Sequence, residues 1–298
     1  RLAIIVGDTI NNTLQPTENL NIVGSTFTRN SATSAGAVDA YGTENAHILD
    51  CSFDDNTAAD EGGALLMTGE FGLVDNCNFT NNKAANGSAI SYTPKALGIQ
   101  DPTKANITHS RFESNVASDT ATVWFESSHG RIAGCEFTDN TAVNTAGVYV
   151  NIDSVTIEET SFTDNHASGN AGAIYVTAAG NPGSDNIPTK MSSCDFTDNT
   201  AGGDADAVYF AANQGIITKS NFTGNNATNG GAIYATGETL NISNSKFTRN
   251  NARNEGGAVY VKGQASFINY SEFTNNTAVG NGGALVLEGN NQRVFKST

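Results

Sequence analysis

The chain of 298 residues is 38% hydrophobic and 15% charged, and it contains 31 Gly but only 5 Pro and 2 Met. Richness in Gly and Asn, with few runs of helix-forming residues, indicates an all-β protein. The chain has 30 acidic and 15 basic residues, so its formal net charge is -15. The lack of a basic cluster argues against nucleic acid as a partner.

The start of the chain is consistent with an exported protein that has no direct membrane span. Arg1 leads straight into the apolar residues 2–6 with no signal peptide ahead of them, so the chain is either a processed mature form or a piece of a longer protein. No apolar run approaches the roughly 20 residues that cross a bilayer. The acidic, Asn- and Thr-rich composition suits an extracellular protein at a cell surface.

A phenylalanine anchor recurs along the chain at intervals of 25 or 26 residues, apart from two intervals of 33 and 34. Asn follows every anchor by three residues, Ala follows it by five, and Ile, Val or Met precedes it by five. These residue types recur at the same four positions in all ten units, which establishes an internal repeat. The anchors are Phe27, Phe53, Phe79, Phe112, Phe137, Phe162, Phe196, Phe222, Phe247 and Phe273.

A repeat unit of this length is too short to bury its own core, so neighbouring units must stack. Paired glycines, Asn-rich turns and β-branched segments favour short strands over helices. We therefore predict one all-β domain over residues 1–298, a single right-handed parallel β-helix of about ten to eleven coils. With ~4.8 Å per coil, Phe should stack on Phe inside, and Asn should hydrogen-bond to Asn at a corner.

A second signature follows the anchors about ten residues later, as at residues 62–65, 230–233, 256–259 and 282–285, which read Gly-Gly-Ala-(Ile/Leu/Val). Glycine supplies the backbone angles that a corner needs. Together with Phe-x-x-Asn, this signature resembles the polymorphic outer-membrane proteins of chlamydiae, and its Asn/Thr-rich form resembles the adhesin-like β-helix proteins of methanogenic archaea. The resemblance covers essentially the whole chain and implies an extracellular β-helix used for adhesion or surface coating.

An aromatic residue occupies one position of the strand after this second signature in six consecutive coils. If Ile174 and Val176 point inward, alternation along the strand turns Tyr175 and its equivalents outward. Such a ladder is a candidate platform for a glycan or a neighbouring rod; alternatively, these rings merely suit a strand exterior and are half covered by loops. The six residues are Trp124, Tyr149, Tyr175, Tyr209, Tyr234 and Tyr260.

Two loop insertions lengthen the repeat at the corner after this aromatic strand, at about residues 93–104 and 177–190. Each contains Pro and ends in Pro-Thr-Lys. Insertions at one edge of a solenoid are well tolerated and often carry binding. We therefore predict recognition on the aromatic side.

Four cysteines stand two residues before their anchors, where the other coils carry Ser or Thr, so they should fall on one inward ladder: Cys51, Cys77, Cys135 and Cys194. Parallel side chains in adjacent coils have poor geometry for a disulfide. We predict buried free thiols, since no Cys/His spacing suits zinc either.

Three aspartates share one register in successive coils, two residues after the anchor: Asp139, Asp164 and Asp198. Stacked carboxylates repel, so they either hold Ca²⁺ or are solvated turn residues. Because other coils carry Arg, Asn or Gly at this position, we predict turn residues, with no metal and no cofactor.

The alternative function is a carbohydrate-active β-helix enzyme, either a polysaccharide lyase or a glycoside hydrolase. Asp54, Asp55 and residues 129–132 faintly resemble elements of polygalacturonases. They should lie on different sides and some three coils apart, too far to flank one glycosidic bond. We predict no catalytic centre.

Nine Asn-x-Ser/Thr sequons are candidate N-glycosylation sites of a surface glycoprotein, although a chain so rich in Asn, Ser and Thr would contain about as many by chance. They are Asn11, Asn78, Asn86, Asn106, Asn221, Asn226, Asn241, Asn269 and Asn275.

Both ends of the chain fall in mid-coil. Residues 3–6 align with the Ala-Ile-Tyr-Val strand, and residues 294–295 resemble the aliphatic strand before an anchor. Uncapped ends allow head-to-tail stacking into a homo-oligomer or filament. There are two alternatives: the chain is a fragment of a longer protein, or its termini fold back as caps. We expect an extracellular structural and adhesive surface protein that binds a glycan or another cell-surface ligand.

Overall fold

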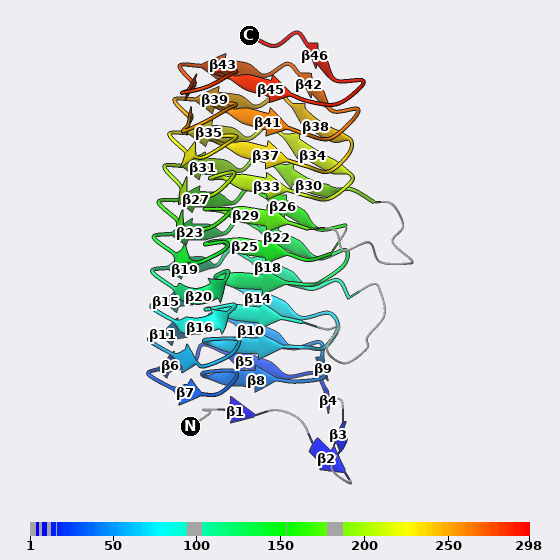
Figure 1. Ribbon diagram of the computed structural model, residues 1–298. Coiled ribbons are helices and arrows are strands. Elements are labelled where there is room, and N and C mark those ends of the chain that lie inside the picture. The colour runs from blue at the N-terminus through cyan, green and yellow to red at the C-terminus, as the bar shows by residue number, and fades with distance from the viewer. Residues whose placement is uncertain are drawn as a thin grey trace.

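The computed structural model describes residues 4–5, 8–10, 13–15, 17–93, 103–152, 154–177 and 187–298. Every regular element within these ranges is a β-strand, and they contain no helix. The strands form four long parallel sheets that wind around one axis as a right-handed β-helix (Figure 1). The predicted fold class is confirmed.

Each complete coil contributes one strand to each sheet, and we number the sheets 1 to 4 in chain order. Sheet 1 holds the aliphatic strands β5 (Asn21–Val23), β10 (His47–Leu49), β14 (Leu73–Asp75), β18 (Asn106–Thr108), β22 (Arg131–Ala133), β26 (Thr156–Glu158), β30 (Thr189–Ser192), β34 (Gly215–Thr218), β38 (Leu240–Ser243), β42 (Phe267–Asn269) and β46 (Arg293–Phe295). Sheet 2 holds the Phe strands β6 (Thr26–Thr28), β11 (Ser52–Asp54), β15 (Asn78–Thr80), β19 (Arg111–Glu113), β23 (Glu136–Thr138), β27 (Ser161–Thr163), β31 (Asp195–Thr197), β35 (Asn221–Thr223), β39 (Lys246–Thr248) and β43 (Glu272–Thr274).

The remaining two long sheets complete each coil. Sheet 3 holds β7 (Ser31–Ala32), β12 (Thr57–Ala58), β16 (Lys83–Asn86), β20 (Val116–Thr120), β24 (Thr141–Ala142), β28 (His166–Ala167), β32 (Thr200–Ala201), β36 (Asn226–Ala227), β40 (Asn251–Ala252) and β44 (Thr277–Ala278). Sheet 4 holds β1 (Ile4–Ile5), β8 (Val38–Ala40), β13 (Leu65–Met67), β17 (Ile90–Tyr92), β21 (Val123–Phe125), β25 (Val148–Val150), β29 (Ile174–Val176), β33 (Val208–Phe210), β37 (Ile233–Ala235), β41 (Val259–Val261) and β45 (Leu285–Leu287). Two small pairs lie near the N-terminus: β2 (Asp8–Ile10) with β3 (Thr13–Gln15), and β4 (Thr17–Glu18) with β9 (Thr43–Glu44).

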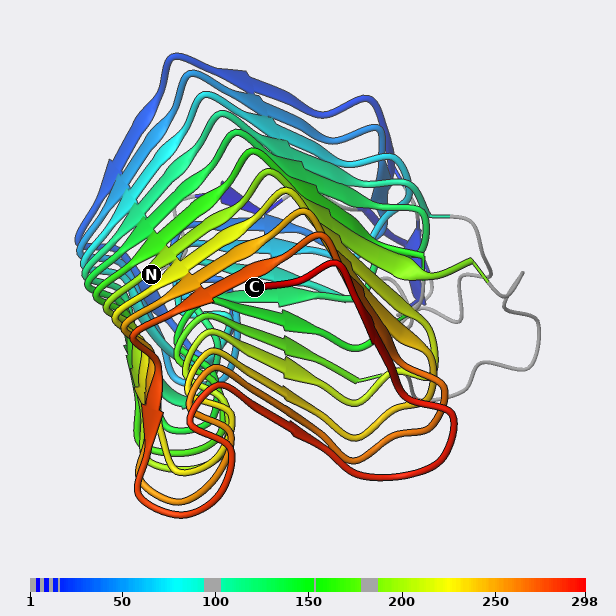
Figure 2. The same ribbon diagram turned by 90° about the horizontal axis from the view of Figure 1, so that it is seen from above.

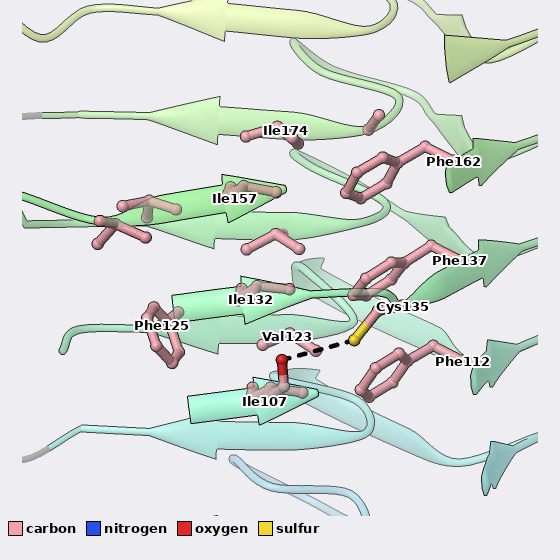
Figure 3. Close-up of a cluster of buried hydrophobic side chains, with 14 of the residues drawn as sticks. Ile107, Phe112, Val123, Phe125, Ile132, Cys135, Phe137, Ile157, Phe162 and Ile174 are labelled. Carbon is pink, nitrogen blue, oxygen red and sulfur yellow. Dashed lines mark hydrogen bonds between the residues drawn. The ribbon is translucent and has the colours of Figure 1, made fainter. Parts of the chain in front are cut away.

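The ten anchors form one continuous ring stack through the core. Neighbouring ring centroids lie 4.5–5.1 Å apart, and the ring planes differ by 11° or less. Nine of the anchors are buried, and Phe273 in the last complete coil is partly buried. The aliphatic residues of sheets 1 and 4 pack against this stack (Figure 3). The predicted Phe ladder is therefore confirmed.

The corner between sheets 2 and 3 is closed by the asparagine ladder. The side-chain nitrogen of Asn140 donates to Oδ1 of Asn165 in the next coil at 2.9 Å and to the carbonyl of Phe112 in the previous coil at 3.0 Å. The same Oδ1 of Asn165 also accepts from the backbone N–H of Asn140 at 3.1 Å. Because the ladder repeats this pattern, polar backbone groups at a dry corner find partners inside the protein. The predicted Asn ladder is confirmed.

The two insertions and the chain ends occupy the predicted places in the repeat. Both insertions fall between a sheet 4 strand and a sheet 1 strand, but residues 94–102 and 178–186 lie outside the described residues. Ile4 pairs with Val38 in sheet 4, and Val294 pairs with Ile268 in sheet 1. Both terminal strands therefore continue the repeat.

Candidate functional site

The six aromatic residues share one register on the outer side of sheet 4. Parallel pairing places Trp124 beside Tyr149, and the remaining tyrosines follow coil by coil up to Tyr260. Ser91 precedes Trp124 in the register, and Val286 follows Tyr260. None of the six rings belongs to the main core, whereas the strand residues on either side of each ring, such as Ile174 and Val176, do. The predicted register and the inward alternation of its neighbours are confirmed.

The rings of this ladder stack on one another along the rod. Successive ring centroids from Trp124 to Tyr260 lie 4.9, 5.5, 4.5, 5.1 and 5.3 Å apart. The planes of Tyr175 and Tyr209 differ by only 8°, whereas the Trp124–Tyr149 and Tyr209–Tyr234 pairs are tilted by 52° and 46°. Ring faces therefore largely meet other rings, which leaves edges and hydroxyl groups for contacts outside the ladder.

Exposure divides the ladder into two parts. The rings of Trp124, Tyr149, Tyr175 and Tyr209 are half-buried, whereas Tyr234 and Tyr260 are only 4% exposed. The corner between sheets 3 and 4 projects as a lobe beside sheet 4 (Figure 2). Ala205 of this corner packs on the two buried rings. All six rings point away from the main core, as predicted, but the alternative of cover by a neighbouring loop holds for Tyr234 and Tyr260.

Polar residues at the next outward position flank the ladder. Lys262 Nζ lies 5.3 Å from the ring centroid of Tyr260 and 5.5 Å from that of Tyr234. The hydroxyl of Tyr260 donates to Glu288 Oε1 at 2.7 Å. Near the other end of the ladder, Asn151 donates to the carboxylate of Glu126 at 2.8 Å. These polar residues were not predicted from the sequence, although their spacing of two residues after the aromatic position, interrupted only by Ala211 within the ladder, was a usable signal.

The hydroxyls of Tyr149, Tyr175 and Tyr209 are protonated at neutral pH. Burial raises the pKa of the Tyr149 and Tyr175 phenols. Burial, together with the neighbouring Tyr175 and Tyr234, raises the pKa of Tyr209 to about 12. Each of these hydroxyls is thus both a hydrogen-bond donor and an acceptor.

The four cysteines are free and buried, as predicted. Cys135 Sγ lies 3.6 Å from the carbonyl oxygen of Ile107 in the previous coil (Figure 3). Burial raises the pKa of the Cys77 and Cys135 thiols to about 12. Thiols of this kind are poor nucleophiles and behave as small apolar core residues.

The three stacked aspartates are turn residues with left-handed backbone. Asp139, Asp164 and Asp198 have φ angles of 54°, 54° and 51°. Asp is among the non-glycine residues that adopt this conformation most readily. Burial and repulsion from its two neighbours raise the pKa of Asp164. Within the described ranges, no group of three or more His, Cys, Asp or Glu side chains could hold a metal ion.

The residues that resemble polygalacturonase elements are not brought together. Asp54 lies in β11 of sheet 2, and Asp55 follows it with a φ of 53°. His129 lies between β21 of sheet 4 and β22 of sheet 1. Three strand steps separate β11 from β23, the sheet 2 strand of the His129 coil. These residues therefore do not form a paired catalytic site.

The sequons differ in accessibility. Asn78, Asn221 and Asn275 are exposed, and all three lie in sheet 2 or directly after it. Asn11 lies outside the described residues. The others are half-buried: Asn86, Asn106, Asn226, Asn241 and Asn269. None of these sequons lies in a strand of sheet 4, so glycans at the exposed sites would leave the aromatic ladder uncovered.

Comparison with known proteins identifies two matching family models. The right-handed beta helix region matches residues 95–266. The Chlamydia polymorphic membrane protein repeat matches residues 50–68 and 270–288, which contain the Phe-x-x-Asn and Gly-Gly-Ala signatures. No curated protein and no solved structure gives a significant match to this chain. Among the described residues, no helix is long and apolar enough to cross a membrane.

Proposed function

The chain belongs to the right-handed β-helix family, whose model matches more than half of its length, and from this premise we propose that it is an adhesive rod at the cell surface. Two matches to the repeat of chlamydial polymorphic membrane proteins support a surface location. The rod is a scaffold that presents the same outward positions once per coil. Binding, rather than catalysis, is its function in this proposal.

One observation carries the proposal: the outer register of sheet 4 presents four half-buried aromatic residues in four successive coils. Ligands with a repeating structure suit such a surface, because each repeat of the ligand meets an equivalent contact. Polysaccharides and surface glycans have this property. The ladder therefore favours an extended glycan chain that lies along the rod axis.

The ring stacking determines how a glycan meets this surface. Because the faces of Tyr149, Tyr175 and Tyr209 largely contact neighbouring rings, sugar rings cannot lie flat on them. The accessible groups are ring edges and protonated hydroxyls, which donate to and accept from sugar hydroxyls. Tyr234 and Tyr260 are too buried to take part and instead hold the lobe against sheet 4.

Replacing Tyr149, Tyr175 and Tyr209 together with Phe tests this proposal, since the variant keeps the ring stack and removes only the hydroxyls. Binding to the glycans that the parent retains on an array should fall by at least about tenfold, because three hydrogen bonds worth roughly 1 kcal/mol each are lost. Tyr41→Phe is the matched control outside the ladder and should bind like the parent. Unchanged binding by the triple variant, with an unchanged far-UV spectrum, would eliminate the ladder as the recognition site.

A further inference from the structure

A second aromatic cluster lies on the outer side of sheet 1, in its last two strands. Phe267 and Asn269 of β42 pair with Arg293 and Phe295 of β46. Tyr270 directly follows β42, and its ring meets that of Phe295 edge-on at a centroid distance of 5.9 Å. Tyr270 is 51% exposed and Phe295 is 47% exposed, so these rings, unlike those of sheet 4, offer free surface to a ligand.

Two cations accompany these rings. Lys296 Nζ lies 5.5 Å from the ring centroid of Tyr270 and 5.2 Å from that of Phe295. Arg293 lines an open hollow of about 310 Å³ together with Phe267 and Asn291. Among the described residues, no carboxylate pairs with Arg293 or Lys296.

The strands at this end of sheet 1 carry no acid. Its last four strands, β34, β38, β42 and β46, contain neither Asp nor Glu. The chain as a whole is strongly acidic, with a formal net charge of -15. The charge of Arg293 at the hollow, with Lys296 beside it, therefore has no carboxylate partner within these strands, which favours an anion there.

We propose that the hollow binds a sugar that bears a carboxylate, such as a sialic or uronic acid residue; this deepens the proposed adhesive function and rests on it. Arg293 presents planar paired donors that match a carboxylate. The ring of Phe267 lines the hollow and suits the apolar C–H side of a pyranose ring, and the exposed edges of Tyr270 and Phe295 lie beside it on the same two strands. Asn291 supplies an amide for sugar hydroxyls.

Titration of the full chain with a sialylated trisaccharide, a glucuronate-bearing disaccharide and neutral lactose tests this site. At least one acidic sugar should bind saturably, lactose should not, and added salt should weaken binding. Free sialic acid and free glucuronate show whether the acidic sugar suffices alone or must end a longer glycan. Failure of both acidic oligosaccharides, or equal binding of lactose, overturns the proposal.

Variants separate this site from the aromatic ladder of sheet 4. Arg293→Gln should weaken binding of the acidic sugar about tenfold, the loss expected for one charge-assisted hydrogen bond. Lys219→Gln removes a cation outside the hollow and serves as the matched control. The triple Tyr→Phe variant of sheet 4 should bind the acidic sugar like the parent. If Arg293→Gln binds the acidic sugar like the parent, the hollow is not the binding site, and the proposal for the aromatic ladder is unaffected. If only the triple variant loses binding on the glycan array, that result supports the ladder independently of the hollow.

Discussion

Asp206 occupies a corner position at which the neighbouring coils carry Gly172 and Gly231. Its side chain is completely buried, and neither carboxylate oxygen has a hydrogen-bond partner. Burial raises the pKa of Asp206 to about 9, against smaller opposing effects of the nearby backbone of Ala201 and then of Arg253. An isolated buried acid remains neutral rather than ionise without a partner.

The raised pKa of Asp206 predicts a specific pH dependence of stability. The unfolded chain loses this proton near pH 3.8 and the folded chain near pH 9, so between these values the unfolded state binds fewer protons. The Asp206 contribution to the free energy of unfolding therefore decreases as pH rises through this window. Asp206→Asn removes the titration and keeps the shape of the side chain.

Thermal melts at pH 4, 7 and 8.5 check this prediction. The melting temperature of Asp206→Asn should exceed that of the parent by an amount that grows with pH, and Asp204→Asn, at a half-buried position nearby, is the matched control. A constant difference across the series would show that Asp206 titrates normally.

At the scale of the strands, two ladders give the coils the same core contacts. They are the ring stack of the anchors and the asparagine ladder at the next corner. Each anchor except the terminal Phe27 and Phe273 lies between two others at 4.5–5.1 Å, and fully buried apolar side chains contribute about 1.5–3 kcal/mol each. Removing a single anchor therefore affects three coils at once.

Phe162→Ala should reduce the free energy of unfolding by about 3–5 kcal/mol, because the cavity lies between Phe137 and Phe196 in a dry core. Urea denaturation followed by far-UV circular dichroism measures the loss. Phe71→Ala, at an exposed site, is the control and should change stability little. If Phe162→Ala and the parent unfolded at the same urea concentration, the coil register would be wrong.

These ladders could be predicted from the sequence because they repeat in every coil. The contacts of a residue that differs from the repeat in one coil only could not be predicted, because no pattern shows which side chains it meets. Strand alternation placed the tyrosines outside the core, but the orientation of their rings depends on neighbouring coils. Burial of Tyr260 depends on Lys262, Glu288 and the lobe, which the repeat pattern does not encode. The hollow beside Arg293 was missed because Phe267, which lines it, and Tyr270, which lies nearby, each occur in one coil only at their positions of the repeat.

At the scale of the whole rod, charge is unevenly distributed. The first 80 residues carry 11 acidic and 2 basic side chains, and the last 80 carry 4 acidic and 7 basic ones. Because the coils stack in chain order (Figure 1), the rod has one acidic end and one weakly basic end. In the last coil, Leu285 and Leu287 are only partly buried, and Val294 is 49% exposed.

Head-to-tail association of the 298-residue chain remains a prediction, which this polarity favours because unlike ends attract. The mean mass from light scattering should rise with protein concentration and fall with added salt, since screening weakens attraction between exposed charges. Deleting residues 1–8 should reduce association by removing strand β1 and its pairing edge. A monomer at every concentration, indifferent to the deletion, would argue against a filament.

The central claim is that this β-helix binds glycans at a surface without cleaving them. The most direct test is a glycan array probed with the full chain, followed by an assay for new reducing ends on every glycan retained. We expect retention of at least one family of extended or acidic glycans with no release of reducing ends. Absence of any retained glycan would contradict the adhesive function, and release of reducing ends would identify the chain as a carbohydrate-active enzyme instead.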